Sequence, residues 1–195
     1  MPRCGAGVFA CITANVLSAV PERKNTRPEA SEIAPHAKIY VDLVPGEDVL
    51  ETLSTQIQRS RRAFESMGEQ RAGSFMYAPG KWTAKQVLGH LIDTERIFDY
   101  RVLRIARGDS TPLSGFEQND YVLTAGSEER SLDDLIDEFQ IVRQSSLKLF
   151  RSLPPEAWDR RGQVSDWSLT VRGIVFTTAG HELHHYRILQ DRYLA

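Results

Sequence analysis

The chain has 195 residues, of which 41% are apolar and 26% are charged, so it is long and apolar enough to form one ordinary globular domain. A formal net charge of −2 gives no electrostatic reason to expect nucleic acid or an anionic membrane as a partner. The two cysteines, Cys4 and Cys11, both lie near the start of the chain. The rest of the chain therefore has no disulfide framework, no cysteine-ligated zinc site and no cysteine nucleophile.

Residues 1–38 are predicted to lie outside the folded domain, as a disordered or weakly signal-like extension. Residues 5–20 form an apolar run that resembles a weak secretory signal and is too short to predict a membrane span. The alternatives are a disordered tail and an extension added by a misplaced start. Residues 21–37 are rich in Pro, Glu and Lys, as is typical of a linker. We therefore expect a domain over residues 39–195 and no integral membrane span. A cytoplasmic location is expected, although the signal-like segment leaves export open.

Four segments of this domain repeat their apolar residues at the spacing of amphipathic helices. Thr83 and Gln86 form a capping-box pattern at the start of the second segment, and Ser131 is a suitable N-cap for the third. Pro154 and Pro155 end the third segment sharply. Strands are expected only in short pieces, such as residues 40–44. The predicted helices cover residues 47–68, 84–107, 132–152 and 171–192.

Four long amphipathic helices in a domain of this size predict an all-α protein with a four-helix bundle. The connection at residues 108–130 is far longer than antiparallel neighbours need, and it is expected to be functional or to cross the bundle. Phe116 and Tyr121 in this connection would either form walls of a substrate site or anchor a surface loop. Two basic clusters at helical spacing are interpreted as solvated helix faces: Arg59, Arg61 and Arg62, and Arg101, Arg104 and Arg107.

The string GHELHHY near the end of the chain contains His181, Glu182 and His185 in the H-E-x-x-H order of zinc peptidases. Two histidines four residues apart on a helix point the same way and suit one metal ion. The common peptidases take a third ligand from downstream, but only ten residues follow His185. In the short variant, Ile188 stands where a glycine must turn the chain, so the helix continues and Asp191 faces away from the metal. The sequence therefore disfavours a peptidase.

A third ligand from upstream is the stronger hypothesis. His90 lies on the apolar side of the second predicted helix, and a bundle can bring it opposite His181 and His185. Three neutral imidazoles with an open position describe a catalytic or exchangeable divalent site, for which zinc and nickel are suitable. The alternative is that His90 is an ordinary core histidine and that the pair binds nothing.

Three further residues are candidates for contacts around such a site. Asp93, one helical turn from His90, would orient the imidazole of that residue. Glu182, outside a peptidase, is expected to support the site or to be solvated. His184 would be a rim residue, a supporting donor or a substitute ligand.

Several ordered motifs are similar to those of the DinB/YfiT-like superfamily, which is unrelated in fold to the translesion polymerase of similar name. The similarity covers roughly residues 40–195. It implies a four-helix bundle and places the three metal histidines of the family at His90, His181 and His185. The motifs are APGKWTAKQVLGHLIDTERIFDYRVLRIARGD, PLSGFEQNDYV, RSLDDLIDEF and GHELHHYRIL.

The resemblance implies a divalent-metal-dependent enzyme that acts on a small molecule, either as a hydrolase or as a transferase that uses a low-molecular-weight thiol. Such a thiol would be external, because the domain has no cysteine. A homodimer is expected from the resemblance. The alternative function is a non-catalytic metal-binding module for stress response or protein interaction.

Overall fold

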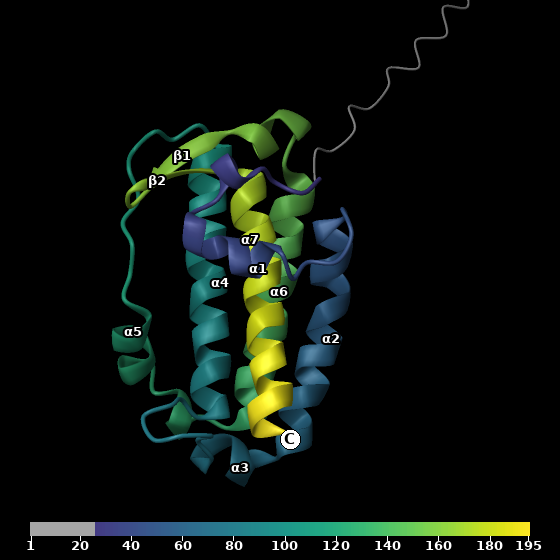
Figure 1. Cartoon of the computed structure of the whole chain (residues 1–195), viewed down its shortest axis with the longest axis vertical. Coiled ribbons are helices and arrows are strands. Elements are labelled where there is room, and N and C mark those ends of the chain that lie inside the picture. Colours follow the sequence, from purple (N-terminus) through teal and green to yellow (C-terminus); the bar gives the residue numbers. More distant parts are fainter. Residues whose placement is uncertain (1–25) are drawn as a thin grey trace, which may run out of the picture.

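The four amphipathic segments fold into four long helices that pack as a bundle (Figure 1). The computed structural model describes residues 26–195, so the signal-like run predicted at residues 5–20 lies outside the described residues. The predicted all-α bundle is confirmed, and each long helix lies close to its predicted range. The long helices are α2 (Val49–Met67), α4 (Ala84–Ala106), α6 (Leu132–Ser152) and α7 (Val171–Ile188). The short ones are α1 (Lys38–Val41), α3 (Glu69–Ser74) and α5 (Gln118–Thr124).

Side-chain caps fix where the long helices begin. Thr83 and Gln86 form the predicted capping box of α4. The backbone N–H of Gln86 donates to Thr83 Oγ1 (3.2 Å), and the backbone N–H of Thr83 donates to the side-chain oxygen Oε1 of Gln86 (2.9 Å). Ser131 caps α6 as predicted, and Thr170 caps α7 by accepting from the Gly173 amide (2.9 Å). These caps satisfy amides that have no partner within their own helix.

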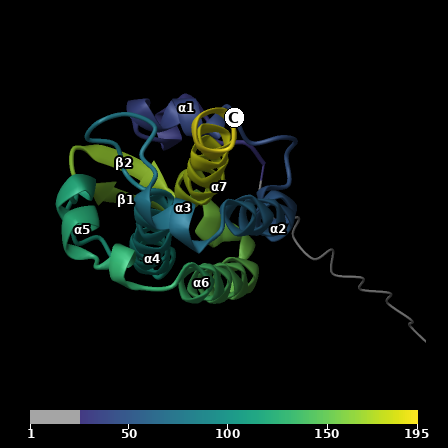
Figure 2. The same cartoon turned by 90° about the horizontal axis from the view of Figure 1, so that it is seen from below.

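The long connection crosses the whole length of the bundle. Seen along its axis, α6 and α7 each lie between α2 and α4, which are diagonal to one another (Figure 2). Lys85 in the first turn of α4 donates to the carbonyl of Arg130, just before α6 (2.6 Å), so both helices begin at the same end. The chain from 107 to 131 must therefore return along the side of α4, and it carries α5 on the way (Figure 1). The predicted crossover is confirmed.

A β-hairpin that the helical periodicity does not predict closes the other end of the bundle. Strands β1 (Arg161–Val164) and β2 (Trp167–Thr170) pair antiparallel, and Ser165 in the turn has a positive φ of 50°. The hairpin also binds the crossing connection, because the Leu113 amide donates to Gln163 O (2.9 Å) and the Ser165 amide donates to Leu113 O (2.8 Å).

Residues 26–44, here called the strap, pack against α7 (Figure 1). The linker predicted up to residue 37 is wrong over this part, because Ile33, Ala34 and Ala37 are buried and Glu32 pairs with Arg172 (2.7 Å). The domain therefore begins before residue 39. The expected strand at residues 40–44 is also wrong, since helix α1 and the turn after it occupy this region.

Glycines on α7 allow the strap to approach the helix backbone closely. A Cβ atom at Gly180 would overlap the carbonyl oxygen of Tyr40, and one at Gly173 would overlap the carbonyl oxygen of Glu32. This close approach holds the strap directly over the helix that carries two of the candidate metal histidines.

The apolar core forms two clusters, one toward each end of the bundle. Between them the four long helices contribute buried polar side chains, among them Gln56, Glu95, Arg143 and Glu182. None of the described helices has the length and apolar character to cross a bilayer. The core therefore has a polar layer at its middle, which is the level at which the candidate site is found.

We expect Gly180→Ala to destabilise the protein by at least about 1 kcal/mol, because the added methyl group would push the strap away from α7. Glycine to alanine inside a helix otherwise stabilises by roughly 0.5–1 kcal/mol. Urea denaturation followed by circular dichroism measures the change. Gly73→Ala is the matched control, because its methyl group would make an ordinary contact with the Lys85 side chain at 3.5 Å. Equal stability of the two variants would contradict the expectation.

Candidate metal centre

Three histidine side chains converge between α4 and α7. His90 comes from α4, and His181 and His185 lie one turn apart on α7. The Nε2 atom of His181 is 3.0 Å from Nε2 of His90 and 3.2 Å from Nε2 of His185. One ring nitrogen from each residue lies within 4.8 Å of the others, so the three can face a single ion.

Burial keeps these imidazoles neutral. The side chains of His90, His181 and His185 are only 3%, 7% and 9% exposed. Burial lowers the pKa of His90 to about 4, and burial together with the neighbouring histidines lowers the pKa of His181 well below its ordinary value. The pKa of His185 is lowered by the same causes. At neutral pH all three rings therefore present lone pairs, which is the form that binds metal.

The spacing of the nitrogens fits a metal ion better than a hydrogen-bonded cluster. Nε2 of His181 can offer one proton or one lone pair, so it cannot satisfy both neighbouring Nε2 atoms by hydrogen bonds. Two nitrogens bound to zinc at 2.0–2.1 Å in tetrahedral geometry lie about 3.3 Å apart, close to the two observed separations. Nδ1 of His185 is buried and has no hydrogen-bond partner among the described residues.

Thr94, and not Asp93, contacts the far side of the His90 ring. Thr94 Oγ1 lies 3.4 Å from His90 Nδ1, one turn along α4. When Nδ1 carries the proton and donates to Thr94, Nε2 turns its lone pair toward the cluster. Asp93 is half-buried, and among the charges that act on it are those of Arg96 and Glu138. The predicted role of Asp93 in orienting His90 is therefore wrong.

Aromatic rings pack around the histidines on both sides. Tyr40 of the strap meets His181 edge-on (ring centres 5.4 Å apart) and His184 (5.2 Å), and Trp82 lies against His90 (4.9 Å). His184 is half-buried between Tyr40 and His185 and does not belong to the converging group. It therefore lies at the rim of the cluster, which is one of the positions expected from the sequence.

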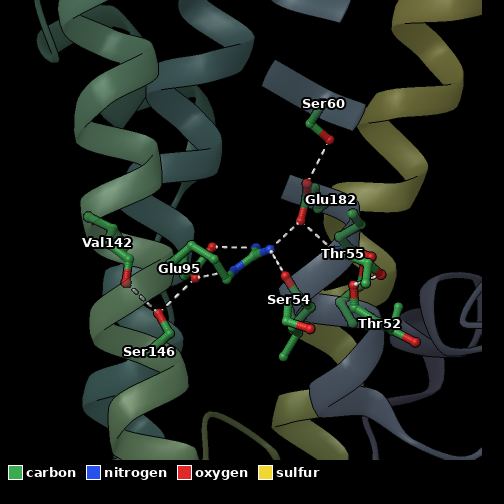
Figure 3. A network of polar contacts seen from close by, with 12 residues as sticks. Thr52, Ser54, Thr55, Ser60, Glu95, Val142, Ser146 and Glu182 are labelled. Carbon is green, nitrogen blue, oxygen red and sulfur yellow. Dashed lines mark hydrogen bonds and ion pairs between the residues drawn. The ribbon is translucent and has the colours of Figure 1, made fainter. Parts of the chain in front are cut away.

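Glu182 points into the interior of the bundle, toward Ser60 and Arg143 (Figure 3). Its two carboxylate oxygens accept hydrogen bonds from Ser60 (2.6 Å), Arg143 (2.6 Å) and the amide of Gln56. The side chain is 2% exposed. A peptidase needs this glutamate beside the metal and free to take a proton. The geometry therefore excludes the peptidase role for Glu182.

A second carboxylate completes the ion group around Arg143. Glu95 of α4 accepts from Nε (2.8 Å) and Nη2 (2.7 Å) of Arg143, and Ser146 on α6 also donates to it (2.7 Å; Figure 3). Ser146 Oγ is also 2.7 Å from Asp99 Oδ2. Because a hydroxyl has one proton, a protonated Asp99 suits this contact. Burial, followed by the charge of Glu95, raises the pKa of Asp99 to about 7.

A cavity of about 410 Å³ lies against His90 and His181. The strap, α4, the crossing connection, the hairpin and α7 all contribute to its lining. Phe116 lines it, as one of the two alternatives for this residue requires. Tyr121 packs against Phe116 (ring centres 5.2 Å apart) but does not line the cavity. Other lining residues are His36 and Tyr40 of the strap, Thr94 and Arg101 of α4, and Trp167 of the hairpin.

Two of these lining residues could have been predicted from their helical spacing relative to His90. Thr94 and Arg101 follow His90 by four and eleven positions, which places them within about 40° and about 20° of it around the helix. The sequence predicts that Arg101 lies on a solvated helix face, but it is 8% exposed, so this prediction is wrong. Tyr40 and His36 could be assigned to the site only once the strap was known to lie on α7.

A four-helix bundle with three buried, converging imidazoles fits the class of metal-binding helical proteins. The chain belongs to the DinB superfamily, whose family model matches residues 52–189. The resemblance found in the sequence motifs is thus confirmed.

A solved structure with the same fold is similar to the chain over most of its length. It is described as "YfiT from Bacillus subtilis is a probable metal-dependent hydrolase with an unusual four-helix bundle topology". The TM-score is 0.65 at 16% identity, over 84% of this chain and 89% of that one, a likeness that shows the fold. No curated protein matches the chain.

We expect Arg143→Met to lower the free energy of unfolding by roughly 3–5 kcal/mol, because Glu95 and Glu182 would be left buried without a counter-charge. Denaturant titration at pH 7 measures this loss. Lys148→Met, at an exposed position on the same helix, is the control and should change stability by no more than about 0.5 kcal/mol. A similar small change for both variants would contradict the role given to the ion group.

Asp99→Asn should stabilise the protein more at pH 8 than at pH 5. The folded-state pKa of Asp99, about 7, lies above the ordinary value of 3.8, so the folded state favours the protonated form. Wild type therefore loses stability as the pH rises from about 3.8 to about 7, and asparagine removes that loss. Unfolding free energies of both proteins at the two pH values test this, and a stability difference independent of pH would refute it.

Proposed function

We propose that this protein is a divalent-metal-dependent hydrolase of small molecules, in which His90, His181 and His185 hold the metal ion. The observation that carries the proposal is the convergence of three buried, neutral imidazoles at the edge of a cavity of about 410 Å³. The description of YfiT as a probable metal-dependent hydrolase supports it. Zinc and nickel are the ions best suited to three imidazole ligands.

A bound divalent ion would supply a Lewis acid and would lower the pKa of a bound water molecule. The protein supplies the orientation: His90 and His181 line the cavity, and Thr94 fixes the ring of His90. We assign Tyr40 as a hydrogen-bond donor to the substrate. Burial raises the pKa of Tyr40, so its hydroxyl stays protonated, and this hydroxyl has no hydrogen-bond partner among the described residues. Glu182 receives no proton-transfer role, because both its oxygens are engaged.

The transferase that uses a low-molecular-weight thiol stays a prediction from the resemblance. The described residues contain no cysteine, so the thiol would have to enter the cavity as a second substrate. The non-catalytic metal-binding module also stays an alternative. It differs from the hydrolase in one measurable respect: a metal that serves the fold alone is needed for folding, whereas a catalytic ion leaves a folded protein when it is removed.

We expect wild-type protein to bind about one equivalent of zinc or nickel through the three imidazoles, and His90→Ala and His181→Ala to lose most of it. Elemental analysis after dialysis against a low free-metal buffer measures the content. Hydrolysis of a panel of activated small esters, amides and phosphoesters should fall more than about 100-fold in both variants, since changes to the residues that support metal ligands already cost 10–100-fold. A parallel set of assays adds a low-molecular-weight thiol and an electrophilic acceptor, and measures transfer of the thiol.

His184→Ala is the matched control, because His184 lies beside the cluster and outside the converging group. It should keep its metal. Equal metal content in all four proteins would end the metal assignment. Loss of the folded state on chelation, seen by circular dichroism, would favour the structural module over the hydrolase. Turnover only in the assays with thiol would favour the transferase.

A further inference from the structure

Arg101 brings a buried positive charge to the cavity. It lies on α4, on the same side as His90, and only 8% of it is exposed. Nη2 donates to the carbonyl of Ser114 in the crossing connection (3.0 Å). The other N–H groups of the guanidinium have no acceptor among residues 26–195. Since a guanidinium carries five donors, most of its binding capacity is left for the cavity.

The lack of a carboxylate partner distinguishes Arg101 from Arg143, the other buried arginine of residues 26–195, and from the partly buried Arg172. Arg143 pairs with Glu95 and Glu182, and Arg172 pairs with Glu32. No carboxylate of the described chain lies within ion-pair distance of Arg101, and its pKa is lowered by burial alone. A buried charge without a counter-charge is costly unless a partner is provided.

The position of the guanidinium relates it to the metal site. Its central carbon lies 5.7 Å from the ring centres of both Phe98 and Phe116, which also line the cavity. The Phe98 ring centre is in turn 6.2 Å from that of His181. A single phenyl ring thus separates Arg101 from the histidine cluster. Stacking on these rings offsets part of the cost of burying the charge, but it provides no hydrogen-bond acceptor.

We infer that Arg101 binds an oxyanion of the substrate, a carboxylate or a phosphate, and so selects small anionic molecules whose other end reaches the histidine cluster. The inference rests on the proposed function only in taking the cavity as the substrate site. Arginine suits this role because its planar fork matches the oxygens of both groups. The rings of Phe98 and Phe116 beside it, and the other apolar side chains that line the cavity, would contact the apolar part of the same molecule.

A purely structural role makes a different prediction. If Arg101 only anchors the crossing connection through Ser114, its loss should loosen the cavity wall and weaken every ligand alike. Arg101→Gln separates the two roles, because a glutamine amide can still donate to a carbonyl but carries no charge. Arg101→Lys keeps the charge, and Arg107→Gln, at the exposed residue that directly follows α4, removes a charge outside the cavity as a matched control.

The experiment measures binding of 3-phenylpropanoate, phenyl phosphate and neutral 3-phenylpropanamide to metal-free full-length protein by calorimetry. Metal-free protein is used because an oxyanion could otherwise bind the ion itself. Wild type should prefer at least one of the two anions over the amide by about tenfold or more, as a charge-assisted hydrogen bond gives. The preferred anion shows whether the oxyanion that Arg101 binds is a carboxylate or a phosphate.

Arg101→Gln should abolish this preference while the affinity for the amide is kept, Arg101→Lys should retain part of it, and Arg107→Gln should leave it unchanged. The inference is overturned if wild type shows no preference, if Arg101→Gln keeps the preference, or if it weakens all three ligands equally. These results require the metal-free protein to be folded, which circular dichroism of the same samples establishes, but they require neither bound metal nor turnover. If the histidine variants show that the protein is not a metal-dependent hydrolase, the anion preference can therefore still be tested independently.

Discussion

The buried guanidinium of Arg143 joins all four long helices. It is 1% exposed, pairs with Glu95 of α4 and Glu182 of α7, and donates to the carbonyl of Leu53 on α2 (3.1 Å). Because an unpaired charge in this position is very costly, none of these helices can rotate or slide without breaking the group. Glu182 is the neighbour of His181 in the chain, so the same constraint that turns the glutamate inward turns the histidines toward α4 and the cavity.

The metal-binding side of the bundle is closed by segments that are not part of the four-helix core. The hairpin hydrogen-bonds to the crossing connection, the strap packs on α7, and all three segments line the cavity. The crossing connection exists because α4 and α6 begin at the same end, which forces the chain to return along α4. The topology therefore supplies a wall to the site that a bundle with short antiparallel connections would lack.

The sequence allowed the long helices to be predicted because their caps and apolar spacing are local signals, as at Thr83 and Ser131. The three histidines could be proposed from spacing and resemblance. The strap could not, because its packing depends on Gly173 and Gly180, glycines that look unfavourable within a helix until the partner is known. The role given to Asp93 failed because a short hydroxyl, Thr94, reaches the ring instead. The homodimer and the cytoplasmic location stay predictions.

The contact between Gly180 and the strap is made by the backbone of Tyr40 and not by its side chain. This contact between the strap and α7 therefore requires no particular side chain at position 40. That side chain is also the one that faces His181. Evolution or design can therefore change the chemistry at this point of the cavity while main-chain contacts still hold the strap, and the stability that is lost is only the packing of the Tyr40 ring against the core.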